Sequence, residues 1–209
     1  MKVSPSLLSA NWAFLAKDIA EVEKAGADLL HIDVMDGHFV QALTMGPKFV
    51  QDINQITTLP LDVHLMVDNP DQLVDSFLKA GADRLSFHVE LNHLDISALL
   101  QKIRSAGCKA GLAINPDTSA DALRKYLDYL DFVLVMTVNP GRSGQAFMPE
   151  VLPKISEIKA MGVQDVTVDG GIDHITIVDV KKTGADTIVS GSYIFGCADK
   201  LSAIQRLKI

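Results

Sequence analysis

Two histidines and two aspartates fall within nine positions of the segment HIDVMDGHF, residues 31–39. The same segment has the apolar pattern of a buried strand that runs into a loop, and buried strands rarely carry charge. Because side chains alternate along a strand, His31 and Asp33 share one face, and the apolar residues beside them face the other way. We therefore expect one imidazole and one carboxylate to project together into the interior of the protein.

A second imidazole and a second carboxylate come from two other predicted strands, since His64 lies near the end of LDVHL and Asp169 ends VTVD. Burying two carboxylates without partners is costly, whereas a divalent cation converts that cost into binding energy. The set His31, Asp33, His64 and Asp169 therefore predicts one divalent metal ion, and mixed nitrogen and oxygen ligands suit Zn, Fe, Mn or Co. Asp62, on the same face as His64, is either an acceptor for a ligand imidazole or a solvated or helix-facing acid.

The elements that must position these residues follow a repeated pattern in which a glycine ends a helix and a short apolar run follows. Glycine adopts the left-handed conformation at a helix end without steric cost, and the run after it is typical of a strand buried on both sides. The pattern occurs in residues 25–34, 80–89, 106–114, 161–169 and 183–191. Helical spacing of apolar residues occurs in 11–25, 70–80, 95–106, 118–130 and 150–160.

Three further strand candidates, in residues 2–8, 59–67 and 130–138, raise the number to eight, and each except the last is visibly followed by a helix. This predicts an α/β fold, a single (β/α)8 TIM barrel over residues 1–209, with an open doubly wound sheet as the structural alternative. Pro5 fits a central strand poorly because it cannot donate a ladder hydrogen bond, so the limits of the first strand stay open. In a barrel, the polar strand ends form one rim, where barrel enzymes place their chemistry.

Composition limits the partners of the protein. The chain has 209 residues, 48% of them hydrophobic, and a formal charge of −7, which predicts one domain and argues against nucleic-acid or anionic-membrane binding. No stretch approaches the length of a membrane span, and the N-terminus does not resemble a signal peptide. Cys108 and Cys197 are too few for a disulfide framework, so we expect a reducing compartment and a cytoplasmic location.

Glycine-containing segments follow three late strands, in NPGRSGQAF (139–147), DGGI (169–172) and SGS (190–192). Backbone N–H groups approach an anion closely only where Cβ atoms are missing, and barrels often hold phosphate on their last loops. Each segment alone could be an ordinary turn, but three around one rim favour a phosphate cradle. The loop at 138–150 is the longest after any strand and is a candidate lid.

These motifs together resemble the ribulose-phosphate 3-epimerase family over almost the whole chain. The resemblance depends on SPSLLSAN, HIDVMDGHFV, LDVHLM, VLVMTVNPG, GQAF, VDGGI and SGSYIFG. It implies a barrel of the ribulose-phosphate-binding type and a metal-dependent enzyme of the pentose phosphate pathway, usually a homo-oligomer. Such an enzyme interconverts D-ribulose 5-phosphate and D-xylulose 5-phosphate.

The resemblance also implies roles for individual residues. His31, Asp33, His64 and Asp169 would be the metal ligands, and Asp33 and Asp169 would also be the acid/base pair. Inversion at C3 removes a proton from one face and returns one to the other, which suits two carboxylates, while the metal stabilises a cis-enediolate. Substrate and phosphate contacts would come from Ser6, His64, Gly141, Arg142, Ser143, Gly144, Asp169, Gly170, Gly171, Gly191 and Ser192. A cap near the reacting carbon would be formed by Met35, Met66 and Met136, for which plain core packing is the alternative.

Arg142 departs from the family pattern, which usually has an aromatic and a small residue between the glycines of this loop. Its side chain could contact phosphate directly or face solvent while the backbone binds, and we favour solvent. The change leaves room for a six-carbon substrate, D-allulose 6-phosphate. His88, on the same strand face as Ser86 and Glu90, is a weaker candidate for the pocket and is not included in the site.

Two other classes of function remain in view. A barrel aldolase or decarboxylase acting on sugar phosphates would need a lysine at a strand end, and the lysines here fall mainly in predicted helices and loops. A sugar-phosphate-binding protein without catalysis would have no reason to keep two opposed carboxylates at a metal. A 3-epimerase therefore remains the leading hypothesis.

Overall fold

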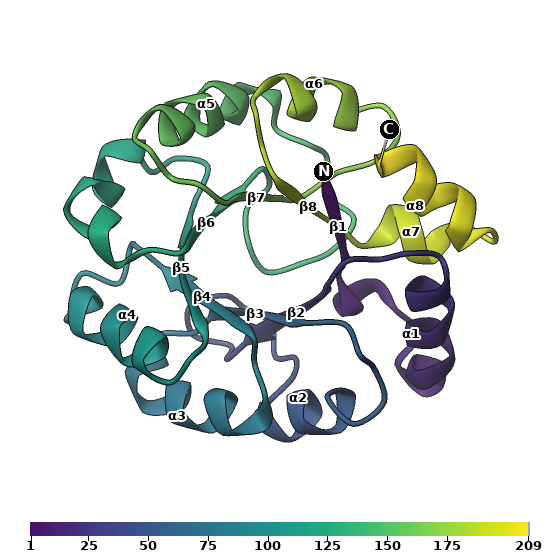
Figure 1. The fold of residues 1–209 in the computed structure, drawn as a ribbon, viewed down its shortest axis with the longest axis horizontal. Helices are drawn as coiled ribbons and strands as arrows, with labels where there is room; N and C mark the ends of the chain where they lie inside the picture. Colours follow the sequence, from purple (N-terminus) through teal and green to yellow (C-terminus); the bar gives the residue numbers. More distant parts are fainter. Residues whose placement is uncertain (209) are drawn as a thin grey trace.

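The computed structural model describes residues 1–208, and its eight parallel strands form a barrel surrounded by helices (Figure 1). The strand order around the sheet is β1-β8-β7-β6-β5-β4-β3-β2, and a parallel bridge between Ser6 and His31 links the two ends. The predicted (β/α)8 barrel is confirmed, and the open doubly wound sheet is not found.

The strands and helices alternate along the chain as predicted. The strands are β1 Lys2–Pro5, β2 Leu30–Met35, β3 Leu61–Met66, β4 Arg84–His88, β5 Lys109–Ile114, β6 Phe132–Met136, β7 Val166–Asp169 and β8 Thr187–Ser190. The α-helices are α1 Leu15–Lys24, α2 Pro47–Ile53, α3 Pro70–Ala80, α4 Ile96–Ser105, α5 Leu152–Ala160, α6 Ile177–Lys182, α7 Ser192–Gly196 and α8 Lys200–Lys208. Short 3₁₀ segments are η1 Leu7–Ser9, η2 Trp12–Phe14, η3 Ala120–Tyr129 and η4 Pro149–Val151.

Segment 118–130 is helical, as expected, but it forms the 3₁₀ helix η3. Its buried residues Ala120, Leu123 and Tyr126 recur every three positions, which matches the three residues per turn of a 3₁₀ helix. The last strand is also followed by helices, α7 and α8, whose pattern was not apparent in the sequence.

Pro5 lies at the end of β1 and pairs with Ser190 of β8, although we expected it to fit a central strand poorly. The amides of Lys2 and Ser6 donate to the carbonyls of Asp186 and Ser190, so the donors directed at β8 are at even positions. Alternation therefore directs the Pro5 nitrogen toward β2, where the ladder is reduced to one bridge. The missing donor thus costs the sheet no hydrogen bond to β8.

The strand residues divide between two apolar layers. Outward residues such as Ile32, Val63 and Phe87 are fully buried under the helices. Inside the barrel, a separate cluster contains Phe132, Leu134 and other residues of the later strands. The polar residues of β2, β3 and β4 share this interior with that cluster, as the predicted alternation requires.

Arg84 fills the barrel interior below the polar cluster. Its guanidinium contacts Asp62 at 3.2 Å and Asp165 at 3.0 Å, donates to Thr167, and lies 4.0 Å from the ring centroid of Phe132. A buried cation with two carboxylate partners fixes the lower ends of four strands relative to one another.

Two of the compositional expectations can be compared with the fold. Cys108 and Cys197 are both free, and Cys108 is buried. Across residues 1–208, every helix is too short or too polar to cross a bilayer.

Candidate active site

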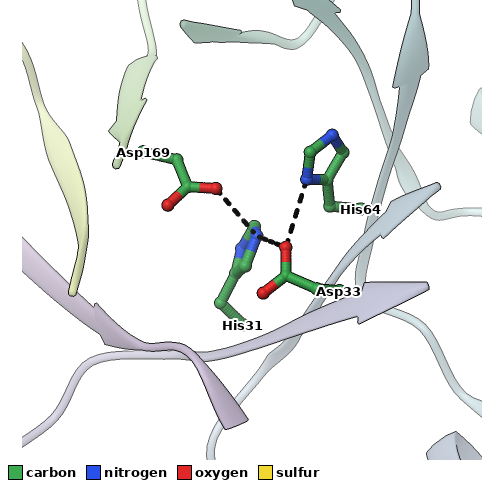
Figure 2. Close-up of side chains that lie close together, drawn as sticks. All are labelled: His31, Asp33, His64 and Asp169. Atoms are coloured by element: carbon green, nitrogen blue, oxygen red, sulfur yellow. Dashed lines mark hydrogen bonds and ion pairs between the residues drawn. The ribbon is translucent and has the colours of Figure 1, made fainter. Parts of the chain in front are cut away.

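His31, Asp33, His64 and Asp169, predicted from three different strands, converge at the carboxyl end of the barrel (Figure 2). His31 Nε2 lies 3.3 Å from Asp33 Oδ1 and 3.7 Å from Asp169 Oδ2, and His64 Nδ1 lies 3.4 Å from Asp33 Oδ1. One potential ligand atom from each residue lies within 4.8 Å of all the others. The structure therefore brings together the whole predicted ligand set.

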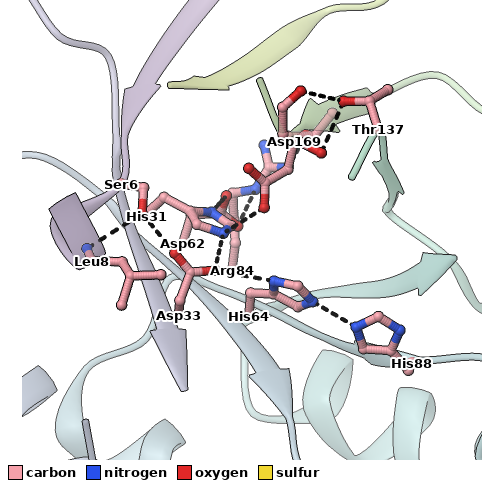
Figure 3. A network of polar contacts seen from close by, with 12 residues as sticks. Ser6, Leu8, His31, Asp33, Asp62, His64, Arg84, His88, Thr137 and Asp169 are labelled. Atoms are coloured by element: carbon pink, nitrogen blue, oxygen red, sulfur yellow. Dashed lines mark hydrogen bonds and ion pairs between the residues drawn. The ribbon is translucent and has the colours of Figure 1, made fainter. Parts of the chain in front are cut away.

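His31 is oriented by the carboxylate that the sequence offered as a candidate acceptor. Its Nδ1 lies 3.0 Å from Asp62 Oδ2, and Asp62 is in turn paired with Arg84 (Figure 3). The other ring nitrogen, Nε2, is fully buried and has no hydrogen-bond partner among the described residues. It is directed at the two carboxylates of the cluster, so in the neutral ring, with the hydrogen on Nδ1, its lone pair faces the position that a ligand would take.

The two carboxylates of the cluster titrate in opposite directions. Burial acts to raise the pKa of Asp33, but attraction and hydrogen bonding from His31 and His64 outweigh it and place this pKa well below its usual range. Burial and repulsion by Asp33 raise the pKa of Asp169 to about 7. Near neutral pH the pair therefore contains an ionised Asp33 and an Asp169 that gains or loses a proton readily.

The two imidazoles also differ. Burial acts to lower the pKa of His31, yet attraction by Asp33 and Asp62 raises it well above its usual value. Burial lowers the pKa of His64 to about 4, against the opposing hydrogen bond to Asp33. The cluster thus attracts positive charge at the position where His31, Asp33 and Asp169 meet.

Ser6 links the first strand to the cluster. Its hydroxyl donates to Asp33 Oδ2 at 2.6 Å and accepts from the amide of Leu8, where it caps η1. The hydrogen bond satisfies the Asp33 oxygen that does not face the imidazoles. Ser6 also lines the pocket above the cluster, in agreement with its predicted place among the substrate-binding residues.

His88, which the sequence left outside the site, is fully buried beside it. Its Nε2 lies 2.9 Å from His64 Nε2, and its Nδ1 lies 3.1 Å from Glu90 Oε2. The signal that could have found this contact was the alternation of Ser86, His88 and Glu90, of which the first two lie on the inner face of β4 and the third just after its end. Arg84 was also missed, because its partners Asp62 and Asp165 are distant in sequence.

A pocket opens above the cluster at the carboxyl ends of the strands. Its lining includes most of the predicted site residues: Ser6, Asp33, Met35, Met66, Met136, Gly141, Arg142, Ser143, Gly144, Asp169, Gly170, Gly171, Gly191 and Ser192. His31 and His64 lie fully buried. The lining also contains residues that the sequence did not single out, among them Leu8, Ser9, Asn139, Gln145 and Ile172.

The loop after β6 is held over the pocket by neighbouring elements. The Ser9 and Ser143 hydroxyls lie 2.5 Å apart, and the Gln145 amide donates to the carbonyls of Asn139 and Arg142. The Arg142 side chain is exposed, as expected for a residue that faces solvent. The loop conformation therefore depends on Gln145 and the serine pair.

Two glycines allow backbone to approach closely at the rim. A Cβ on Gly171, whose φ is +67°, would lie 2.6 Å from the backbone nitrogen of Phe147. A Cβ on Gly191 would collide with the hydroxyl of Ser9. At Gly171 the neighbour is backbone, which leaves no room for a side chain, whereas at Gly191 it is a serine side chain whose hydroxyl can rotate.

Met35 and Met66 pack with Val40 in a small apolar cluster, and Met136 belongs to the interior cluster around Phe132. All three methionines are buried yet line the pocket. They form the apolar wall of the pocket next to Asp33 and Asp169. The same side chains therefore pack in the apolar clusters and lie near the carboxylates.

The chain is a (β/α)8 barrel with a cluster of buried polar side chains at its strand ends, under a pocket rimmed by glycine. Residues 2–195 match the model of the ribulose-phosphate 3 epimerase family, and the chain belongs to that family. It is therefore an isomerase, of the epimerase type.

Curated relatives cover nearly the whole chain. It is 47% identical to "Ribulose-phosphate 3-epimerase" of Bacillus subtilis (strain 168), over 100% of this chain and 98% of that protein. It is 44% identical to "Ribulose-5-phosphate-3-epimerase, chloroplastic" of Arabidopsis thaliana, over 99% of this chain and 75% of that protein. A crystal structure of 3-hexulose-6-phosphate synthase, at 18% identity and a TM-score of 0.73, covers 100% of this chain and 98% of its own and shows the shared fold alone.

Proposed function

We propose that this protein is a metal-dependent epimerase that interconverts D-ribulose 5-phosphate and D-xylulose 5-phosphate. The observation that carries this proposal is the convergence of Asp33 and Asp169 on the unpartnered Nε2 of His31, under the pocket of a chain from this family. Two carboxylates with opposite proton affinities can remove and return a proton at one carbon.

The cluster fits one divalent cation. His31 Nε2 and His64 Nδ1 supply nitrogen, Asp33 and Asp169 supply oxygen, and the buried lone pair of His31 lacks a protein partner among the described residues. This mixed set suits Zn, Fe, Mn or Co. When bound, the cation would supply Lewis-acid stabilisation for the negative charge that develops on the substrate oxygens.

The carboxylates carry the proton transfers. In one direction the ionised Asp33 accepts the proton from C3 on one face, and Asp169 donates a proton to the opposite face. The reverse reaction exchanges these roles. Ser6 keeps Asp33 in place through its hydrogen bond, and the wall of Met35, Met66 and Met136 restricts water beside the enediolate.

The substrate phosphate would bind at the glycine rim. The pocket that contains the carboxylates is also lined by Gly141, Arg142, Ser143, Gly144, Gly170, Gly171, Gly191 and Ser192. The close approach of backbone at Gly170 and Gly171 suits an anion held by N–H groups. None of the described residues that line this pocket is a lysine, so it offers no Schiff-base residue for aldolase chemistry.

The proposal also covers the domain organisation, the assembly, the location and the partners of the protein. Residues 1–209 would act as one catalytic domain. The enzyme would assemble as a homo-oligomer and work in the cytoplasm, with a ketose phosphate as its small-molecule partner and neither nucleic acid nor a membrane.

Activity with chelation and metal add-back tests the proposal. The value of kcat/KM is measured on D-ribulose 5-phosphate and D-allulose 6-phosphate, before chelation, after it, and after adding each candidate metal. We expect turnover of the pentose phosphate to disappear on chelation and return with metal. Undiminished turnover after chelation would contradict the metal requirement, and a preference for the hexose phosphate would overturn the substrate assignment.

A further inference from the structure

Four aspartates repeat one arrangement at the base of the barrel, where the strands begin, and the proposed reaction does not use them. Each lies one or two residues before an even-numbered strand. Its amide donates to the carbonyl of a residue on the preceding strand, and the amide of that residue donates back to the aspartate carboxylate at 2.8–2.9 Å. The four pairs are Asp28 with Val3, Asp83 with Leu61, Asp131 with Ala110, and Asp186 with Val166.

The junction between β1 and β2 differs from the other three junctions that carry such a pair. Four registered residue pairs join β3 to β4 and β5 to β6, and three join β7 to β8. Among the described residues, β1 and β2 share one isolated bridge, between Ser6 and His31 (Figure 1). Pro5 accounts for the short pairing, because its nitrogen faces β2 and cannot donate. The Asp28 pair therefore replaces ladder hydrogen bonds at this junction, whereas the other three pairs add to a ladder.

Asp28 also contacts the last helix. Its Oδ2 lies 2.8 Å from Lys208 Nζ in the last turn of α8. Both side chains are about a third exposed, so water weakens this ion pair. We therefore assign the closure of the barrel base mainly to the hydrogen bonds between Asp28 and Val3.

The upper ends of the same two strands carry part of the proposed site. Ser6 follows β1, and its hydroxyl donates to Asp33 Oδ2 on β2 at 2.6 Å. The position of Ser6 relative to Asp33 thus depends on how β1 lies against β2. Because one bridge alone pairs the strands at this end, the contact at the base constrains the angle and separation between them.

We propose that Asp28 is a positioning residue that closes the barrel between β1 and β2 and thereby keeps Ser6 against Asp33. The inference deepens the proposed function and rests on it for the effect on turnover. The other three aspartates act on strands whose register is already fixed by a ladder. Their loss lowers stability but leaves the cluster residues in place.

Asp28→Ala, which removes the acceptor for Val3, is the variant that tests this inference. Asp83→Ala is the matched control, because it removes the same kind of pair from β3, the strand of His64, where the ladder remains. Asp28→Asn is the conservative variant, since its side-chain oxygen can still accept from Val3 while the charge that faces Lys208 is lost. Circular dichroism and thermal melting verify folding and give the change in global stability.

Hydrogen exchange of the metal-free protein reports on the junction without any use of activity. The Leu30 amide donates to Pro60 on the side of β3, so alternation directs the His31 amide toward β1. After correction for global stability, we expect this amide to exchange about 10-fold faster in Asp28→Ala than in wild type. In Asp83→Ala and Asp28→Asn we expect a change of less than about threefold.

Turnover reports on the position of Ser6. The value of kcat is measured on D-ribulose 5-phosphate with metal added back, at a temperature where every variant is folded. We expect a decrease of about 10-fold in Asp28→Ala and of less than about threefold in Asp83→Ala and Asp28→Asn, because a small displacement of groups around the reacting carbon slows the reaction.

Each outcome has a defined meaning. Faster His31 exchange and slower turnover in Asp28→Ala alone support the inference. Unchanged exchange in Asp28→Ala, equal effects in Asp83→Ala, or faster exchange with unchanged turnover overturns it. If Asp28→Ala does not fold, wild type decides, since the Val3 and His31 amides must then exchange through openings of equal free energy. A wild type that converts no ketose phosphate would contradict the proposed function, while exchange would still decide whether Asp28 closes the barrel.

Discussion

The two sides of the pocket are built from different parts of the polypeptide. On the side of β2, β3 and β4, fully buried side chains meet in a network of hydrogen bonds and ion pairs around His31 and His64. On the side of β6, β7 and β8, glycines such as Gly170 and Gly171 let backbone segments approach one another. On the first side we expect substitutions that change the chemistry of a side chain to have the largest effect. On the second side we expect substitutions that add a side chain to a glycine to have the largest effect.

The largest expected effect is at the two carboxylates that face each other across the pocket, Asp33 on β2 and Asp169 at the end of β7. Asp33→Asn and Asp169→Asn each keep the shape of the residue but remove a proton acceptor, so we expect kcat to fall by about 10³-fold or more in each. The measurement is conversion between the two pentose phosphates at saturating metal, with C3 hydrogen exchange followed in D₂O. Turnover above about a tenth of the wild-type value in either variant would contradict the assigned pair.

Gly171→Ala tests the side built from backbone. The new methyl would meet the Phe147 backbone at a residue whose φ is positive, so we expect a loss of about 1–3 kcal/mol in stability and a raised KM as the loop after β6 is displaced. Thermal melting and substrate titration measure the two effects.

Gly26→Ala is the matched control for Gly171→Ala. Gly26 has a φ of +87°, but its Cβ would have open space, and it lies at the end of α1. It should lose stability through strain alone and keep the wild-type KM. If both variants show the same KM, the close approach at Gly171 has no part in substrate binding.

A smaller effect concerns how the stability of the metal-free protein changes with pH. Asp169 has a raised pKa of about 7 in the folded state, so its protonation favours folding below about pH 4, and this contribution is lost as the pH rises through 7. The melting temperature of wild type relative to Asp169→Asn should therefore decline from pH 4.5 to pH 8 without metal. A constant difference across that range would show that Asp169 titrates normally.

The smallest effect is expected at Arg142. Its side chain is exposed, and Gln145, through the carbonyls of Asn139 and Arg142, holds the loop. Arg142→Ala should reduce kcat/KM by much less than 100-fold. A loss greater than about 100-fold, equivalent to about 2.7 kcal/mol, would show that the guanidinium contributes directly to phosphate binding.

The same difference between the two sides explains which parts of the fold and of the site could be predicted from the sequence. The barrel and the convergence of the four cluster residues were predictable, because period-two alternation and strand order determine which side chains meet at a rim. Gly171 and Gly191 were predictable at the rim because glycine-containing segments after the late strands are visible in the sequence. Their roles in binding remain predictions.

Other contacts depend on geometry that the sequence does not encode locally. Arg84 contacts Asp165 across the barrel, although the two residues are 81 positions apart in the chain. The contact between His88 and His64 depends on the register between β3 and β4, which pairs His64 with Ser86. The 3₁₀ form of η3 is apparent from which of its residues are buried in the structure, at every third position. These details come from register and packing between strands, which single-sequence patterns leave undetermined.

The seam between β1 and β2 connects assembly of the site with folding. One isolated bridge joins Ser6 to His31 there, and the Ser6 hydroxyl reaches Asp33 across the same seam. A molecule whose seam is open has no completed cluster, so any ligand of the cluster binds the closed barrel selectively and lowers its free energy by mass action. During refolding, ligand binding therefore reports the moment when the first strand joins the second.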